Sequence, residues 1–199
     1  GLRSISQYFT GTPRSLPMMT ATIEHIGGDV LTRIPPRFGV NRQRMSACDR
    51  NTTAPTSRIG IDFFPKLEAT PEVRAVVITG SGKGFCSGGD RHDIIARLFE
   101  RDMQGLLDFT RTTGKLIQAI SQVRRPVIAA VNGVAVGAGA VMALACDVRI
   151  VSDDARFGFV FPKVGLSGAD MGAAYLLPRV VGLGRASELL FTGELIDAA

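Results

Sequence analysis

The sequence predicts an α/β protein with parallel strand pairing, and three observations lead to that prediction. Short apolar runs typical of buried strands occur at residues 71–79 and 126–131. Each run is followed by a glycine-rich loop. Apolar residues at helical spacing then follow, at residues 92–125 and 137–147. Strands that alternate with helices in this way indicate a parallel sheet.

The remaining elements are predicted in chain order from the same patterns. Residues 62–70 read as the end of a helix, and residues 92–125 are long enough for two helices. Residues 148–159 are typical of a strand. Glycine and proline then divide residues 172–182 and 184–193, which we expect to form two short helices.

Charge is distributed unevenly along the chain. Residues 1–66 carry nine Lys/Arg against four Asp/Glu, whereas residues 67–199 carry fourteen of each. We therefore predict two regions: an irregular, Arg-rich and aberrant N-terminal segment over 1–66, and a regular core over 67–199. A frameshifted stretch within residues 30–60 is one hypothesis for the irregular pattern. The basic residues form no stripe interleaved with aromatics, so we predict no nucleic-acid binding.

Three cysteines, Cys48, Cys86 and Cys146, show neither a metal-site spacing nor a disulfide framework. This usage, with no secretory signal pattern, predicts a cytoplasmic protein with reduced thiols. Residues 126–146 are uncharged and about as long as a membrane-spanning helix. An Asn-Gly pair and two further glycines favour a strand, a turn and a short helix instead, so we predict no membrane span.

Two loops carry the strongest chemical signal: "GFCSGGD" at residues 84–90 and "NGVAVGAGA" at residues 132–140. Each follows a buried strand and leads toward a helix. Glycine allows backbone N–H groups to approach a ligand, and a helix start adds unpaired donors. Two such donors aimed at one point would form an oxyanion hole. Two tight turns without a ligand remain the alternative.

Other chemistries fit the first loop less well. The spacing of Gly80, Gly82 and Gly84 matches neither a P-loop nor a dinucleotide-binding fingerprint. A cysteine hydrolase with Cys86 as nucleophile and His92 as base is a further alternative. Cys86 stands between Phe and a glycine turn, where a small buried residue is expected.

The segments "VVITGSGKGFCSGGD", "RRPVIAAVNGVAVGAGAVMALACDVRIVSDDARFGF" and "GLGRASELLFTGELIDA" together resemble the crotonase, or enoyl-CoA hydratase/isomerase, superfamily over residues 67–199. The resemblance implies a spiral of ββα units, here without the C-terminal helical part, that binds an acyl-CoA thioester. It implies that the N–H groups of Gly89 and Ala138 bind the thioester carbonyl. It implies no metal and no cofactor other than the coenzyme A of the substrate.

The same resemblance suggests further binding residues and an assembly. Ser87, Gly89, Asp90 and Arg91 would form the binding loop, with Asp90 equally suited to cap a following helix. Lys163 and Arg91 are candidate phosphate-side contacts, although solvated surface is the commoner role. A homo-trimer or hexamer is expected if C-terminal helices are present.

The catalytic acids of the family's hydratases are not found at their usual positions. The resemblance aligns Val141 with the first glutamate and Phe161 with the second. Asp170, in "GLSGADMGAAYLLPR", resembles the acidic residue of the family's dienoyl-CoA isomerases. We interpret Asp170 as the general base or as the cap of the next helix. The predicted function is proton transfer or hydration at an unsaturated acyl-CoA. A catalytically degenerate acyl-CoA-binding or scaffold protein is the alternative.

Overall fold

The computed structural model describes residues 20–23, 63–65, 67, 69, 73, 75–80, 83–88 and 96–198 of the chain. Its strands form two four-stranded sheets. The first sheet is wholly parallel in the order β1-β2-β4-β6, and its strands are β1 (Thr20–Ile23), β2 (Ala75–Thr79), β4 (Val127–Val131) and β6 (Val148–Val151). The second has the order β3-β5-β7-β8, with β3 (Gly84–Cys86), β5 (Val134–Val136), β7 (Arg156–Gly158) and an antiparallel β8 (Leu195–Asp197).

From β2 to β7, successive strands alternate between the two sheets, which gives the fold its repeat. The pairs β2/β3, β4/β5 and β6/β7 each turn one corner from the first sheet to the second, and helices follow each pair. The predicted α/β architecture with parallel strands and repeated ββα units is therefore confirmed.

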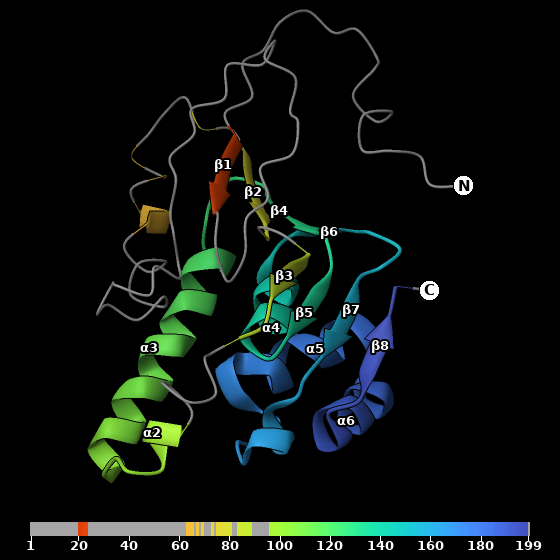
Figure 1. Cartoon of the computed structure of the whole chain (residues 1–199). Coiled ribbons are helices and arrows are strands. Elements are labelled where there is room, and N and C mark those ends of the chain that lie inside the picture. Colours follow the sequence, from red (N-terminus) through yellow and green to blue (C-terminus); the bar gives the residue numbers. More distant parts are fainter. Residues whose placement is uncertain are drawn as a thin grey trace, which may run out of the picture.

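In the view of Figure 1, α3 lies to the left of the strands, and α5 and α6 lie below them, close to the C-terminal strand β8. The bounds of the helices are α2 (Ala96–Leu98), α3 (Met103–Ser121), α4 (Ala138–Ala145), α5 (Ala173–Val181) and α6 (Leu183–Thr192), with short 3-10 helices η3 (Phe161–Val164) and η4 (Asp170–Gly172). The predicted division of residues 92–125 is confirmed, because Asp102 caps α3 by accepting a hydrogen bond from the Gly105 N–H at 2.8 Å.

Continuous apolar sequence explains the central elements. Alternate residues of β2 and β4 are buried, and six of the eight residues of α4 are buried between its neighbours. The uncharged stretch 126–146 is divided into β4, β5 and α4, as expected apart from the extra strand. Among the described helices, none combines the length and apolar character needed to cross a membrane.

Several elements differ from the sequence prediction. Both glycine loops contain a three-residue strand, β3 and β5, and residues 148–159 form two strands rather than one. The strands β1 and β8 were not predicted. Residues 63–65 and 67 are helical, as expected. The boundary at residue 66 stays a prediction, because most of residues 1–66 lie outside the described part of the chain.

Candidate functional site

Ala138 is the first residue of α4, and its N–H group lies just beyond the end of the paired strands β5 and β7. β5 pairs with β7 up to Val136 and Gly158, and the Gly137 N–H then donates to the Gly158 carbonyl at 2.8 Å. Gly137 has a φ of 55°, which favours glycine, and turns the chain directly into α4. The N–H groups of a first helical turn have no acceptor within the helix. Ala138 therefore stands at a helix start, and its role in binding a thioester carbonyl stays a prediction.

The first loop lies directly against this helix start. A methyl group added at Gly88 would stand 3.4 Å from the Ala138 nitrogen and 3.2 Å from the Val136 carbonyl oxygen. One added at Gly139 would stand 2.3 Å from the Cys86 carbonyl oxygen. The two glycine loops thus meet backbone against backbone, which only residues without side chains allow at these points.

Cys86 serves this junction by being small and buried. Its side chain is 1% exposed, and its sulfur accepts a hydrogen bond from the Gly88 N–H at 3.3 Å. A nucleophilic cysteine needs access to a substrate, so this burial argues against the cysteine-hydrolase alternative. His92, the base in that alternative, lies outside the described residues.

Of the predicted binding loop, the structure describes only the first member. Ser87 is exposed immediately after β3. Gly89, Asp90 and Arg91 lie outside the described residues, so their roles stay predictions. Lys163 is exposed at the end of η3, and its aliphatic chain runs beside Gly193 at the end of α6.

Asp170 begins η4, a short helix that packs against α3, α4 and α5. Ser167 holds the preceding turn, because its carbonyl accepts from the Asp170 N–H at 3.0 Å and its hydroxyl from the Ala169 N–H at 3.2 Å. The Asp170 carboxylate accepts from the Met171 N–H at 2.8 Å, and Met171 has a left-handed φ of 52°. Asp170 therefore bonds to the residue directly after it, within η4.

Burial raises the pKa of the Asp170 carboxyl above its ordinary value of 3.8, and the Met171 N–H opposes this rise. A carboxyl group with a raised pKa holds a proton more firmly than an ordinary carboxyl, which suits a group that takes up and returns a proton. η4 also contacts α4, the helix that begins at Ala138.

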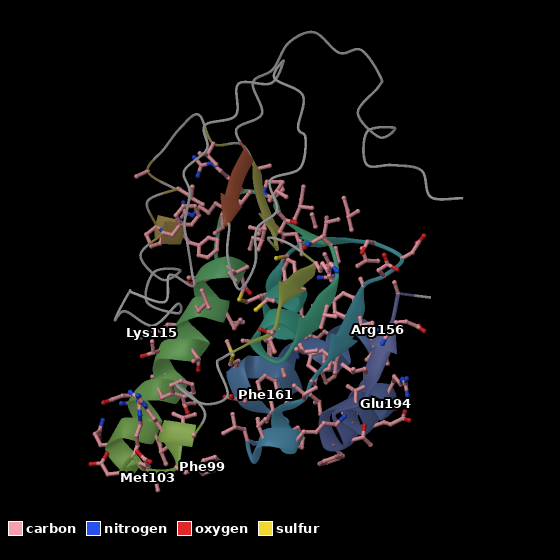
Figure 2. All side chains as sticks on the ribbon, in the orientation of Figure 1. Phe99, Met103, Lys115, Arg156, Phe161 and Glu194 are labelled. Atoms are coloured by element: carbon pink, nitrogen blue, oxygen red, sulfur yellow. The ribbon has the colours of Figure 1, made fainter. Side chains whose placement is uncertain are left out.

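The two positions aligned with the family's glutamates hold apolar side chains in the core. Val141 is fully buried in α4, and Phe161 is 5% exposed at the start of η3. The Phe161 ring, labelled in Figure 2, lies 3.8 Å from where a methyl group on Gly137 would stand. Phe161 thus packs beside the second loop but has no group that can exchange a proton.

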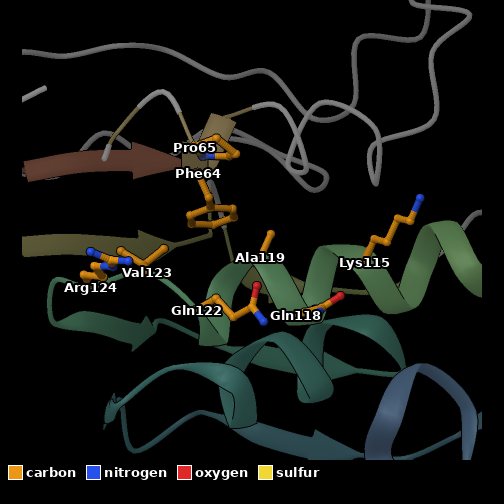
Figure 3. A pocket seen from close by; sticks show the side chains of 8 residues that line it. All are labelled: Phe64, Pro65, Lys115, Gln118, Ala119, Gln122, Val123 and Arg124. Carbon is orange, nitrogen blue, oxygen red and sulfur yellow. The ribbon is translucent and has the colours of Figure 1, made fainter. Parts of the chain in front are cut away.

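A cavity of about 640 Å³ lies elsewhere, along the C-terminal half of α3 (Figure 3). Its lining combines apolar, amide and cationic side chains: Phe64, Pro65, Lys115, Gln118, Ala119, Gln122, Val123 and Arg124. None of these residues belongs to the two loops or to η4. In the part of the chain that the structure describes, no three His, Cys, Asp or Glu side chains are grouped to hold a metal.

Sequence reasoning missed one polar residue of this region. Asn132 follows β4 and bonds to the backbone on both sides of the turn before β3. The pair Asn132-Gly133 was interpreted only as a turn signal, which gives no indication of a distant backbone partner.

Comparison with known proteins assigns residues 54–199 to the family described as Enoyl-CoA hydratase/isomerase. An enoyl-CoA hydratase of Alternaria alternata is 37% identical over 143 residues, which are 69% of this chain and 45% of that protein. The 1,2-epoxyphenylacetyl-CoA isomerase of Escherichia coli is 37% identical over 137 residues, 69% of this chain and 52% of that protein.

Solved structures give the same result. The crystal structure of a candidate enoyl-CoA hydratase from Streptomyces coelicolor A3(2) matches with a TM-score of 0.69 and 51% identity. The match covers 72% of this chain and 52% of that one. The chain therefore spans about half the length of the curated relatives that it matches.

Proposed function

Because the chain belongs to the enoyl-CoA hydratase/isomerase family, we propose that it binds an unsaturated acyl-CoA thioester and catalyses proton transfer or hydration on it. The observation that supports this proposal most is the meeting of the two glycine loops at the first turn of α4. The relatives named above include both a hydratase and an isomerase, so the family alone does not choose between the two reactions.

The proposed oxyanion hole uses the N–H groups of Gly89 and Ala138. Removing a proton beside a thioester moves an electron pair onto the carbonyl oxygen and forms an enolate. Fixed amide dipoles aimed at that oxygen stabilise the new negative charge. The contact between Gly88 and Ala138 supports a donor from the next residue of the first loop, Gly89. Coenzyme A enters as part of the substrate, so the proposed step needs no resident cofactor.

Asp170 is the proposed acid–base group. In an isomerisation, its carboxylate would take a proton from one carbon of the acyl chain, and the resulting enolate would be held by the two N–H groups. The protonated carboxyl would then return the proton to another carbon, so the double bond moves while the composition is unchanged. The raised pKa of Asp170 supports this role, because the group can hold the proton between the two transfers.

A second candidate is an acyl-CoA-binding protein with little catalytic activity. Val141 and Phe161 favour it, because buried apolar side chains cannot serve in the two-glutamate hydration of the family. The two candidates share the oxyanion hole and differ in the contribution of Asp170.

Calorimetry with crotonyl-CoA tests the shared part of the proposal, with free coenzyme A and NAD as controls. We expect the thioester to bind more tightly than free coenzyme A, because only the acylated form carries the thioester carbonyl oxygen that the proposed hole would bind. Equal affinities would contradict the oxyanion hole. Turnover of enoyl- and dienoyl-CoA substrates that Asp170→Asn abolishes would support the enzyme. Tight thioester binding without turnover would support the binding protein.

A further inference from the structure

Asn132 connects two corners of the fold through its side-chain amide. It directly follows β4, whose partner β2 ends at Thr79, beside Ala130. Its Oδ1 accepts a hydrogen bond from the Gly80 N–H at 2.9 Å, and its Nδ2 donates to the Gly84 carbonyl at 3.3 Å. One half-buried side chain thus holds both ends of the link 80–84 between β2 and β3.

That link determines where β3 lies. Gly80 and Gly84 lie close together, since a methyl group on Gly80 would stand 2.1 Å from the Gly84 carbonyl oxygen. From Gly84, the strand pairs with β5 through Gly84–Val134 and Cys86–Ala135, with a shift of register between the two pairs. A movement of Gly84 along β5 would therefore carry the rest of the first loop with it.

Gly88 of that loop lies beside the start of α4. Two residues beyond Cys86, Gly88 approaches the Ala138 nitrogen as described above. The side chain of Asn132 is therefore linked to the hole through Gly84 and β3. The backbone of Asn132 continues through β5 to Ala138. Asn132 is thus connected to the first loop by its side chain and to the second loop by its backbone.

The corresponding corner of the next unit makes no such connection. Val131 of β4 pairs with Val151 of β6, so Ser152 occupies the position that Asn132 occupies one unit earlier. The Ser152 N–H donates to the Val131 carbonyl at 2.9 Å. Its buried hydroxyl has no hydrogen-bond partner among the described residues. A side-chain bond at this corner is therefore not a general requirement of the repeat.

We propose that Asn132 is a positioning residue that sets the distance between the two oxyanion-hole loops by holding Gly80 and Gly84. The inference rests on the proposed function, because it concerns the same hole. Asn132 does not touch the reacting atoms in this account. Its contribution is to fix the backbone of the first loop relative to Ala138.

Acetoacetyl-CoA is the probe for the experiment, because its bound enolate can be followed by ultraviolet absorbance without any catalytic proton transfer by the protein. The 199-residue chain is compared with Asn132→Ala, Asn132→Asp and the matched control Ser152→Ala. For each, the apparent pKa of the bound probe, the affinity for free coenzyme A and the Tm are measured. We expect Asn132→Ala to lower enolate stabilisation about tenfold, with the affinity for free coenzyme A within about twofold. We expect Ser152→Ala to change neither by more than about twofold.

In Asn132→Asp, the pH determines which of the two hydrogen bonds the side chain can form. Its ionised carboxylate still accepts from Gly80 but repels the Gly84 carbonyl, whereas its protonated form can donate to that carbonyl again. Relative to the unsubstituted protein at each pH, we expect its enolate stabilisation to recover as the pH falls. This comparison remains available if Asn132→Ala does not fold.

The outcomes distinguish this inference from the function on which it rests. If the unsubstituted protein itself fails to favour the enolate, the oxyanion hole is wrong and the role of Asn132 falls with it. If it favours the enolate and the Asn132 variants match Ser152→Ala, the positioning role alone is overturned. Equal losses of free coenzyme A and enolate binding would also overturn it, since they indicate general structural damage.

Discussion

At the scale of single residues, the first loop depends on Gly88. This residue has a φ of 83°, which costs a residue with a side chain about 1–2 kcal/mol. An added methyl group would also stand close to Val136 and Ala138. We expect Gly88→Ala to weaken crotonyl-CoA binding at least about tenfold, because it displaces the loop from the Ala138 N–H. Calorimetry measures the change.

Gly84→Ala is the matched control for this substitution. Gly84 belongs to the same loop, but a methyl group there would meet only the Val134 carbonyl oxygen, at an ordinary 3.7 Å. We expect its thioester affinity to remain within about twofold of the unsubstituted protein. Similar losses in both variants would mean that neither glycine can be replaced, and the expected difference between Gly88 and Gly84 would be wrong.

Asp170 gives a prediction about pH. Burial raises its pKa in the folded state, so the unfolded chain releases this proton more readily than the folded one. The free energy of unfolding should therefore decrease as the pH rises through the titration range of Asp170. We expect Asp170→Asn to raise the Tm at neutral pH, and the difference to vanish below the ordinary carboxyl pKa of 3.8. Thermal unfolding at several pH values measures this effect.

The same variant should lose catalysis, by about a hundredfold or more if Asp170 is the acid–base group. Asp153→Asn, which removes an exposed carboxylate between β6 and β7, serves as the control for both measurements. A variant that gains stability and keeps its turnover would leave Asp170 as a buried structural carboxyl without a chemical role.

At the scale of elements, the contact between β3 and α4 requires a glycine. A methyl group at Gly139 would stand 2.3 Å from the Cys86 carbonyl oxygen, and backbone cannot move aside cheaply. We expect Gly139→Ala to lower the free energy of unfolding by about 1–3 kcal/mol, as measured in urea. In α3, Gly114 faces open space, so Gly114→Ala should raise it by about 1 kcal/mol. If both substitutions changed the free energy of unfolding in the same direction and by the same amount, the close packing at Gly139 would be contradicted.

The elements also show how far the sequence could predict the fold. β2 and β4 were predicted because continuous apolar runs are typical of strands buried in a parallel sheet. β3 and β5 were missed because three residues in a glycine-rich stretch carry no periodic signal. They form because they pair with each other, for example at Gly84 and Val134, which lie far apart in the sequence. The sequence of either segment alone does not predict this pairing.

The residues of the candidate site also differ in how far the sequence could predict them. The helix start at Ala138 could be predicted, because a glycine-rich strand end followed by an Ala-rich run indicates that a helix begins there. Ala138 itself was identified as a candidate donor only through the family resemblance. Asp170 was found through a family resemblance and not through periodicity. Asn132 was missed, since its partners Gly80 and Gly84 lie about fifty residues earlier in the chain. Backbone acceptors and donors are common to all residues, so no local pattern predicts which of them a side chain will find.

At the scale of the whole molecule, one hydrophobic core joins both loops to α4, α5 and α6. Two cysteines in different elements are buried in this core: Cys86 in β3 is 1% exposed, and Cys146 at the end of α4 is 4% exposed. Burial raises the pKa of the Cys146 thiol to about 12. Since the thiolate is the reactive form, this thiol should resist alkylation while the protein is folded.

If the core unfolds as one unit, both thiols should become reactive together. In a Cys48→Ser background, we expect iodoacetamide at neutral pH to label Cys86 and Cys146 at one common, slow rate, which increases in parallel as urea is added. Mass spectrometry of the two peptides measures each rate. Faster labelling of Cys86 would contradict a single unit, because it would mean that the first loop opens while α4 stays folded. The proposed oxyanion hole would then be assembled only part of the time, and thioester affinity should decrease in proportion to the open population.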